Sequence, residues 1–190
     1  VADPTQPSVV SASAMVHVEA PAPTPKAGVW KWDGRGWWYR YEDGSYPADA
    51  TLVIDGVTYR FDESGYMRTG WVKDRGVWYY HNASGAQVSG WVLSGLSLYY
   101  LNPGTGAMAM GWVQVGSTCY DLNPATGAMR TGWLKEGAAW YYLQPSGAMA
   151  TGWLKEGSAW YYLDETGVMV TGDRVIDGVA YSFDSSGRMR

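Results

Sequence analysis

The sequence predicts an all-β fold: a β-solenoid of stacked β-hairpin repeats of about 20 residues, with an extended N-terminal linker. The first observation is a period, because a Gly-Trp pair recurs every 20 or 21 residues. The second is that an aromatic segment follows each of these tryptophans by seven residues, and a Gly-x-Met string comes after it in most repeats. The recurring tryptophans are Trp71, Trp91, Trp112, Trp133 and Trp153. A period of this length is typical of solenoids, in which each unit buries its apolar face only against its neighbours.

Each repeat contains two short apolar segments around a turn. In residues 132–143 these segments flank Lys-Glu-Gly, where glycine supplies the positive φ of a tight hairpin turn. Side chains alternate along a strand, so we expect Trp140 and Tyr142 to share one face and Tyr141 to point to the other. We expect the methionine after each loop glycine to fill an irregular gap beside the aromatic rings.

The ends of the chain differ from the central repeats. Residues 1–27 are rich in proline and alanine and lack aromatic residues, which predicts an extended linker over 1–27 and a repeat domain over 28–190. We interpret 28–50 as a divergent first repeat by placing residues 36–39 on residues 76–79. The repeats at 51–61 and 173–183 are also atypical, as the ends of a solenoid require. The charged end at 188–190 disfavours edge pairing of the last strand.

Composition excludes several functional classes. A net charge of −4 and a pI near 5.1, without a Lys/Arg cluster, argue against nucleic acid or an anionic membrane as partner. No apolar stretch approaches the ~18 residues of a membrane span, so we expect no membrane insertion.

The residues that usually carry catalysis are scarce. The chain has two histidines, His17 and His81, and neither belongs to the repeat of its single cysteine, Cys119. A nucleophile needs a base within hydrogen-bond reach. We therefore expect Cys119 to be a small packed substitute for tryptophan, and we expect no catalytic residue, metal site or cofactor.

A single cysteine allows no disulfide within the chain. A secreted protein without disulfides fits a Gram-positive cell surface.

The aromatic residues favour binding. The 12 Trp and 15 Tyr against 2 Phe are typical of surfaces where a ring packs at one end and meets water or ligand at the other. Trp133 and Trp140 lie on the two strands of one predicted hairpin, and Tyr162 of the next hairpin can supply a third wall. Such a cage attracts a quaternary ammonium, with ~millimolar affinity for one cage and higher avidity for several. The alternative is that the rings only form the core, which we expect for the middle tyrosines Tyr79, Tyr99, Tyr120, Tyr141 and Tyr161.

The motif at 131–143 and its continuation at 147–153 resemble the cell-wall-binding repeat of choline-binding proteins, which are Gram-positive surface proteins and wall hydrolases. The resemblance covers about 28–190. It implies a secreted, cell-wall-associated module that anchors its protein by binding the choline of teichoic or lipoteichoic acids between repeats. It also implies that two aromatic residues of one repeat and one of the next form each site. The matching residues are Trp71, Trp78 and Tyr100, then Trp133, Trp140 and Tyr162, then Trp153 and Trp160 facing Ser182, with Met149, Trp112 and Tyr142 as further candidates.

Two alternatives remain open. Related arrays in glucan-binding glucosyltransferases and clostridial toxins bind glycans, and the strings at 55–61 and 177–183 resemble those. The other alternative is that the array binds no small ligand and serves as a scaffold. Because Leu98 and Cys119 replace a tryptophan, we expect fewer good sites than repeats. The resemblance leaves open whether an enzyme, an adhesin or a toxin precedes the repeats.

Overall fold

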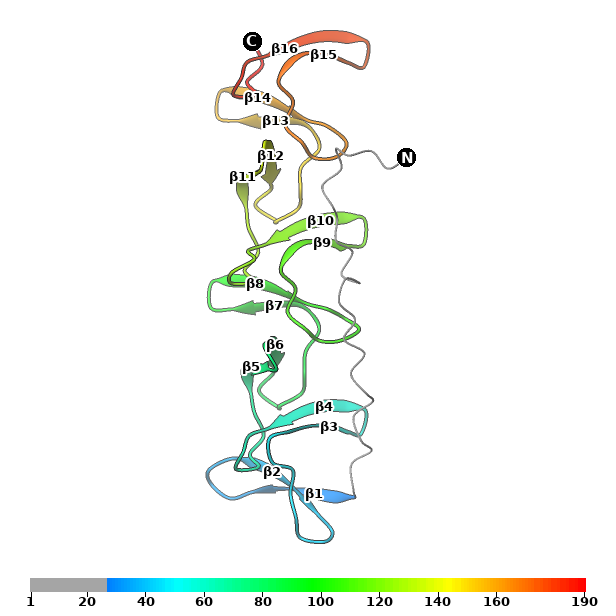
Figure 1. Cartoon of the computed structure of the whole chain (residues 1–190), viewed down its shortest axis with the longest axis vertical. Helices are drawn as coiled ribbons and strands as arrows, with labels where there is room; N and C mark the ends of the chain where they lie inside the picture. Colours follow the sequence, from blue (N-terminus) through cyan, green and yellow to red (C-terminus); the bar gives the residue numbers. More distant parts are fainter. Residues whose placement is uncertain (1–26) are drawn as a thin grey trace. The chain divides into compact units, whose positions relative to one another are not determined.

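The computed structural model describes residues 27–190, which form eight consecutive antiparallel β-hairpins (Figure 1). The prediction of an all-β array of hairpin repeats is confirmed. The predicted linker falls almost wholly on residues 1–26, which lie outside the described residues, so its boundary stays a prediction. The strands are β1 (Gly28–Trp32), β2 (Trp37–Tyr41), β3 (Ala50–Ile54), β4 (Val57–Phe61), β5 (Gly70–Asp74), β6 (Val77–His81), β7 (Gly90–Ser94), β8 (Ser97–Leu101), β9 (Gly111–Val115), β10 (Thr118–Leu122), β11 (Gly132–Glu136), β12 (Ala139–Leu143), β13 (Gly152–Glu156), β14 (Ala159–Leu163), β15 (Gly172–Ile176) and β16 (Val179–Phe183).

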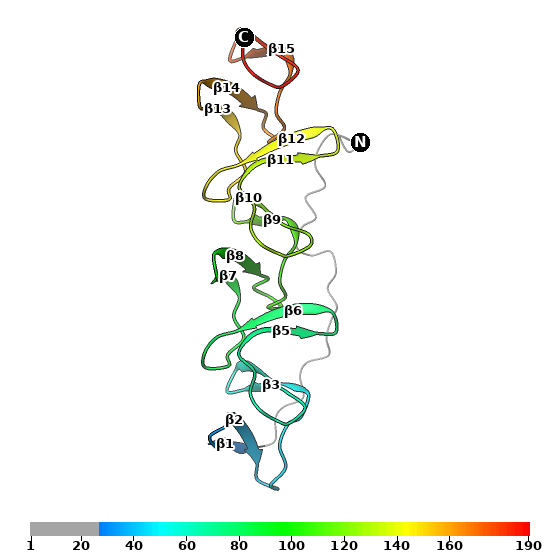
Figure 2. The same ribbon diagram turned by 90° about the vertical axis from the view of Figure 1, so that its left-hand side faces the viewer.

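The chain divides after Ala109 into two compact units. Four hairpins, β1 to β8, belong to residues 27–109, and four, β9 to β16, belong to residues 110–190. Within each unit, consecutive hairpins point in different directions around the stack (Figures 1 and 2). The direction recurs with every third hairpin: β7–β8 points the same way as β1–β2, and β15–β16 the same way as β9–β10.

Turn length distinguishes the first hairpin from the others. Each later hairpin closes with a two-residue turn, such as Asp55-Gly56, where both residues have positive φ (52° and 78°) as a type I′ turn requires. In β1–β2 the closing pair is Trp32 with Trp37, which leaves a four-residue loop at 33–36. Trp32 and Trp37 are five residues apart, as are the paired Lys73 and Trp78, so the first hairpin lacks only the innermost pair of the later ones.

Within each unit, hydrogen bonds from the loops join each hairpin to the one before it. The backbone N–H of Met169, after β14, donates to the carbonyl oxygen of Trp140 in β12 at 2.8 Å. The N–H of Met108, after β8, donates in the same way to Trp78 in β6 at 2.8 Å. The methionine position is therefore a backbone link between repeats as well as a packing position.

The methionine side chains pack against glycine in the following loop, as their predicted gap-filling role requires. A Cβ added to Gly167 would lie 2.5 Å from the Sδ of Met149, and the φ of Gly167 is +83°. Both the space and the backbone conformation therefore require glycine there. The same contact recurs in other loops, and in the first of them Tyr46 takes the place of methionine against Gly65.

In both units, core residues stand at the ends of return strands. Phe61, Leu101, Leu122, Leu143 and Leu163 are fully buried there, and Phe183 is nearly so. His81 is buried at the same position, and its Nδ1 lies 2.9 Å from the carbonyl oxygen of Gly85. Since a carbonyl only accepts, Nδ1 carries the proton. Burial holds the pKa of His81 below its usual 6.5, so the ring is neutral. Residues 27–190 include no helix that is long and apolar enough to span a membrane.

Candidate functional site

The strand register places two tryptophans, a lysine and a tyrosine on one face of a hairpin. In β11–β12, Trp133 lies opposite Tyr142 and Lys135 lies opposite Trp140. Directly opposed residues share a face, and so do residues two apart along a strand. The ring centroids of Trp133 and Trp140 are 6.4 Å apart with an interplanar angle of 84°. The two indoles therefore form the walls of a corner.

A third ring comes from the following hairpin. The ring of Tyr161 in β14 lies 4.8 Å from that of Trp133, at 64°. We call such a set of three rings an aromatic corner and name it by its first tryptophan. Two further corners repeat this geometry: corner 71 with tryptophans 6.4 Å apart and Tyr at 4.8 Å, and corner 153 with 6.2 Å and 4.8 Å. Their members are Trp71, Trp78 and Tyr99, and Trp153, Trp160 and Tyr181.

The tyrosines expected as third walls lie elsewhere. Tyr162 packs against Trp153 of its own hairpin at 5.2 Å, and Tyr100 is buried against Trp91 of its own hairpin at 5.0 Å. The further candidate Tyr142, in contrast, does lie at corner 133: it shares the face of Trp133 and Trp140, and its ring is 5.2 Å from that of Trp133. Neighbouring residues of a strand point to opposite faces, so Tyr161 and Tyr162 cannot both face the preceding hairpin.

The middle tyrosines have two roles. Tyr141 and Tyr161 are buried, as expected for core residues. Their rings also contact the preceding tryptophan: Tyr161 at Trp133, and Tyr141 at Trp112 with a centroid distance of 5.1 Å. At corner 153 this contact is made by Tyr181, while Ser182 lies opposite Asp173 in β15.

The outer tryptophan of each corner is partly open to solvent. Trp78, Trp140 and Trp160 are 38%, 37% and 38% exposed. A lysine ammonium lies 5.5 to 5.6 Å from the centroid of each of these rings, within the range of a cation–π contact. The lysines are Lys73, Lys135 and Lys155. Each corner thus already attracts a cation to its outer ring.

In corners 71 and 133, the inner tryptophan is oriented by a hydrogen bond to the following hairpin. The indole Nε1 of Trp71 donates to Ser94 Oγ at 3.0 Å. The indole of Trp133 donates to the Glu156 carboxylate, which ends β13. This bond fixes the angle of the inner wall relative to the outer one.

The first hairpin carries a set of rings that sequence reasoning missed. The N–H of Met67 donates to the carbonyl of Trp37 at 2.7 Å, the contact that Met108 makes with Trp78. Trp37 therefore corresponds to Trp78, and the alignment of Trp38 with Trp78 is wrong by one residue. The spacing in the sequence gives the same answer, because Trp37 follows Trp30 by seven residues, as Trp78 follows Trp71.

With this register, Trp30 occupies the position of Trp71. Its ring lies 4.9 Å from Tyr59 of the next hairpin, close to the 4.8 Å of the corners above. At the lysine position stands Trp32, whose ring lies 5.7 Å from that of Trp37. Both Trp32 and Trp37 are exposed. The first hairpin thus has an aromatic pair where the other corners have tryptophan and lysine.

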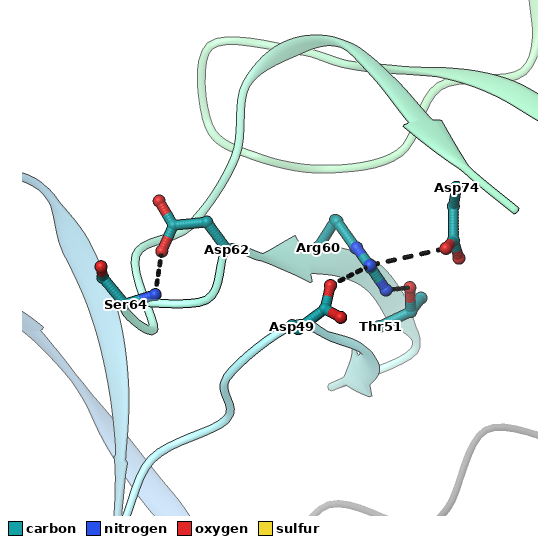
Figure 3. Close-up of polar contacts among 6 residues, drawn as sticks. All are labelled: Asp49, Thr51, Arg60, Asp62, Ser64 and Asp74. Atoms are coloured by element: carbon teal, nitrogen blue, oxygen red, sulfur yellow. Dashed lines mark hydrogen bonds and ion pairs between the residues drawn. The ribbon is translucent and has the colours of Figure 1, made fainter.

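In the second hairpin, β3–β4, polar residues replace the aromatic set. Arg60 lies across from Thr51, at the position Tyr80 holds across from Trp71. Its guanidinium is 2.6 Å from Asp49 Oδ1, 3.1 Å from Thr51 Oγ1 and 3.5 Å from Asp74 Oδ1 (Figure 3). Since Asp74 belongs to β5, this cluster ties the two hairpins together by ion pairs where a corner would open.

The fifth hairpin, β9–β10, keeps only the inner tryptophan. Cys119 is partly exposed at the second tryptophan position, and Asp121 lies across from Trp112. Asp121 is almost fully buried with Arg130 Nη1 at 3.3 Å, and its burial raises the pKa of the carboxyl against the effect of Arg130. The candidate Trp112 therefore has a next-hairpin ring but no perpendicular partner.

The candidate Met149 makes the methionine–glycine contact between successive loops, with its Sδ against Gly167. Its N–H donates to the carbonyl of Cys119 at 2.8 Å. Among residues 27–190, no three His, Cys, Asp or Glu side chains are grouped so that they could hold a metal ion.

A stack of hairpins with recurring, partly open aromatic corners defines a repeat module for ligand binding. The family model of the choline-binding repeat matches residues 51–84, 69–111, 130–173 and 150–190, which together cover more than half of the chain. The chain belongs to this family of choline-binding repeat proteins. Hairpin β1–β2 lies outside the matched segments.

Solved structures of pneumococcal proteins show the same arrangement. CbpJ of Streptococcus pneumoniae is similar with a TM-score of 0.76 and 38% identity, over 82% of this chain and 56% of that one. Choline-binding protein F of Streptococcus pneumoniae is similar with a TM-score of 0.72 and 34% identity, over 81% and 55%. The modular autolysin LytC of the same species gives 0.61 and 26%, over 86% and 39%. The chain thus spans about half of CbpJ and of choline-binding protein F. A comparison with curated protein sequences gives no significant match.

Proposed function

We propose that this chain is a non-catalytic module that anchors a secreted protein to the cell wall by binding the choline of teichoic or lipoteichoic acids in its aromatic corners. The observation that carries the proposal is the recurrence of two perpendicular tryptophans and a next-hairpin tyrosine at corners 71, 133 and 153. Three ring faces around one space attract a quaternary ammonium, which cannot donate hydrogen bonds and is easily desolvated.

Affinity at one corner is modest. Each ring contributes ~0.5–2 kcal/mol, so three rings are consistent with a dissociation constant of ~1 mM, about −4 kcal/mol. Several corners on one chain can raise the avidity for a choline-bearing polymer by ~10²–10⁴-fold. This explains why the corner is repeated.

The relatives support the ligand class. Choline-binding protein F has been solved with a peptidoglycan analogue and with ipratropium, a quaternary ammonium compound. In LytC, the related region belongs to a modular autolysin, so an enzyme elsewhere in the full protein is compatible with a binding role for this chain. Location at the bacterial surface follows from the same role.

We propose Tyr99, Tyr161 and Tyr181 as the third walls, in place of Tyr100, Tyr162 and Ser182. The ring distances of 4.8 Å to the preceding tryptophan support this choice.

A titration of tryptophan fluorescence with choline, with glucose and lactose in parallel, tests the proposal. We expect a saturable change with choline that is reduced in Trp140→Ala and unchanged in Asp55→Asn, a turn position of β3–β4, which contributes no residue to corners 71, 133 or 153. No response to choline would refute the proposal, and silence with all three compounds would leave the array as a scaffold.

A further inference from the structure

A second kind of hollow lies beside the first hairpin. It has a volume of about 180 Å³ and is lined by Asp33, Trp38, Tyr46, Ser64 and Tyr66. None of these residues belongs to an aromatic corner, and the choline-binding role does not use them.

The aromatic side of the hollow is fixed by packing. The ring of Tyr46 meets that of Trp38 edge-on, with centroids 6.1 Å apart at 82°. Tyr46 also packs against Gly65, where a side chain would collide with its ring. Although it is held at these two points, Tyr46 is 51% exposed. It therefore offers a fixed aromatic surface to solvent.

The polar side of the hollow is ordered by Asp33. The Tyr66 hydroxyl donates to Asp33 Oδ2 at 2.8 Å, and the backbone N–H of Arg35 donates to Oδ1 at 3.1 Å. The Tyr66 bond, with the backbone bond, holds the pKa of Asp33 below its usual value, so the carboxylate is an ionised acceptor. The Arg35 guanidinium lies 5.4 Å from the Tyr66 ring and offsets the charge of Asp33.

One donor beside the hollow has no acceptor. The indole Nε1 of Trp38 is buried and makes no hydrogen bond. A buried N–H without an acceptor costs about 1–3 kcal/mol, so such groups normally have a partner. The hollow itself offers a fixed carboxylate, the Ser64 hydroxyl and an aromatic surface, with the buried Trp38 N–H behind them.

This combination selects a ligand class. The trimethylammonium group of choline can neither donate a hydrogen bond to Asp33 nor exchange one with the Ser64 hydroxyl, and an anion would be repelled by Asp33. A sugar ring has hydroxyls that both donate and accept, and an apolar C–H face that can lie on an aromatic ring. We propose that the hollow binds one neutral sugar ring, with hydroxyls donating to Asp33 and exchanging a hydrogen bond with the Ser64 hydroxyl, and with its C–H face on Tyr46.

Spectra of the indole N–H groups test the site on the intact chain. In ¹H–¹⁵N correlation spectra, the peaks of Trp38 and Trp140 are assigned by their loss in Trp38→Phe and Trp140→Phe. Glucose, galactose, N-acetylglucosamine and choline chloride are then titrated separately. We expect the Trp38 peak to move saturably with at least one of the sugars and to stay in place with choline.

The variant Asp33→Asn keeps the shape of the side chain and removes its charge. We expect it to weaken the sugar response about tenfold, since hydrogen bonds to charged groups are the stronger ones. Unchanged positions of the other indole peaks verify that the variant is folded. The matched control Asp55→Asn, in a turn away from the hollow, leaves the sugar response as it is in the wild type.

The outcomes separate this inference from the choline proposal. A Trp38 peak that ignores all three sugars, or moves equally in Asp33→Asn, overturns the sugar site whatever choline does at Trp140. A Trp38 peak that responds to sugar beside a Trp140 peak that ignores choline sustains the sugar site and overturns the choline proposal.

Discussion

Two neighbouring tyrosines, Tyr161 and Tyr162, are candidates for the third ring of corner 133. Tyr161 lies 4.8 Å from Trp133, while Tyr162 lies 5.2 Å from Trp153 on the other face of β14. We predict that Tyr161→Leu weakens choline binding at corner 133 and that Tyr162→Leu does not. Leucine keeps apolar volume at a buried position but removes the electron-rich ring face.

The size of the effect follows from one ring. A single cation–π contact is worth ~0.5–2 kcal/mol, which corresponds to a change of ~2–30-fold in the dissociation constant. The matched variant Tyr162→Leu removes the same ring one residue away, so general destabilisation of β14 would affect both variants alike.

The assay is the choline titration of the Trp140 indole peak, which reports corner 133 separately from the other corners. We expect Tyr162→Leu to bind choline at corner 133 as tightly as the wild type does, and Tyr161→Leu to bind it more weakly. A larger loss in Tyr162→Leu than in Tyr161→Leu would refute the assignment of Tyr161 and restore the one made from the sequence.

Three further perturbations test other parts of the structure. Lys135→Met removes the ammonium 5.6 Å from the Trp140 ring and should strengthen choline binding ~2–5-fold in calorimetry; a weaker affinity would mean that the lysine assists the ligand. Gly147→Ala places a methyl group at φ +83° against Met129 and should lower the free energy of unfolding by ~2–4 kcal/mol in urea; a loss below ~1 kcal/mol would contradict the packing. Because burial lowers the pKa of His81, the unfolded chain protonates it first as pH falls below 6.5, so stability is full above 6.5 and declines below it. His81→Leu, which matches the leucine of other repeats, should reduce the fall in melting temperature between neutral and mildly acidic pH, and an unchanged fall would exclude His81 as its source.

Much of the fold was predictable because the repeat is local. The Gly-Trp period, the turn glycines and the alternation of Trp140, Tyr141 and Tyr142 each follow from a few adjacent residues. Hairpins with two-residue turns have a fixed register, so the sequence sufficed to pair Trp133 with the strand that carries Trp140.

The contacts between successive hairpins were harder to predict. Which of Tyr161 and Tyr162 meets Trp133 depends on how one hairpin is rotated on the next, and no local pattern contains that rotation. The first hairpin was misaligned for another reason: matching Gly36 to Gly76 put Trp38 on Trp78, whereas the seven-residue spacing of Trp30 and Trp37 puts Trp37 there. The Arg60 cluster was also missed, because its partners Asp49 and Asp74 lie in different repeats.

A crystal structure determined at saturating choline tests the central claim most directly. The account predicts a trimethylammonium group at corner 133, in contact with the rings of Trp133, Trp140 and Tyr161, and equivalent density at corners 71 and 153. Empty corners, or choline bound against Tyr162 instead, would contradict it.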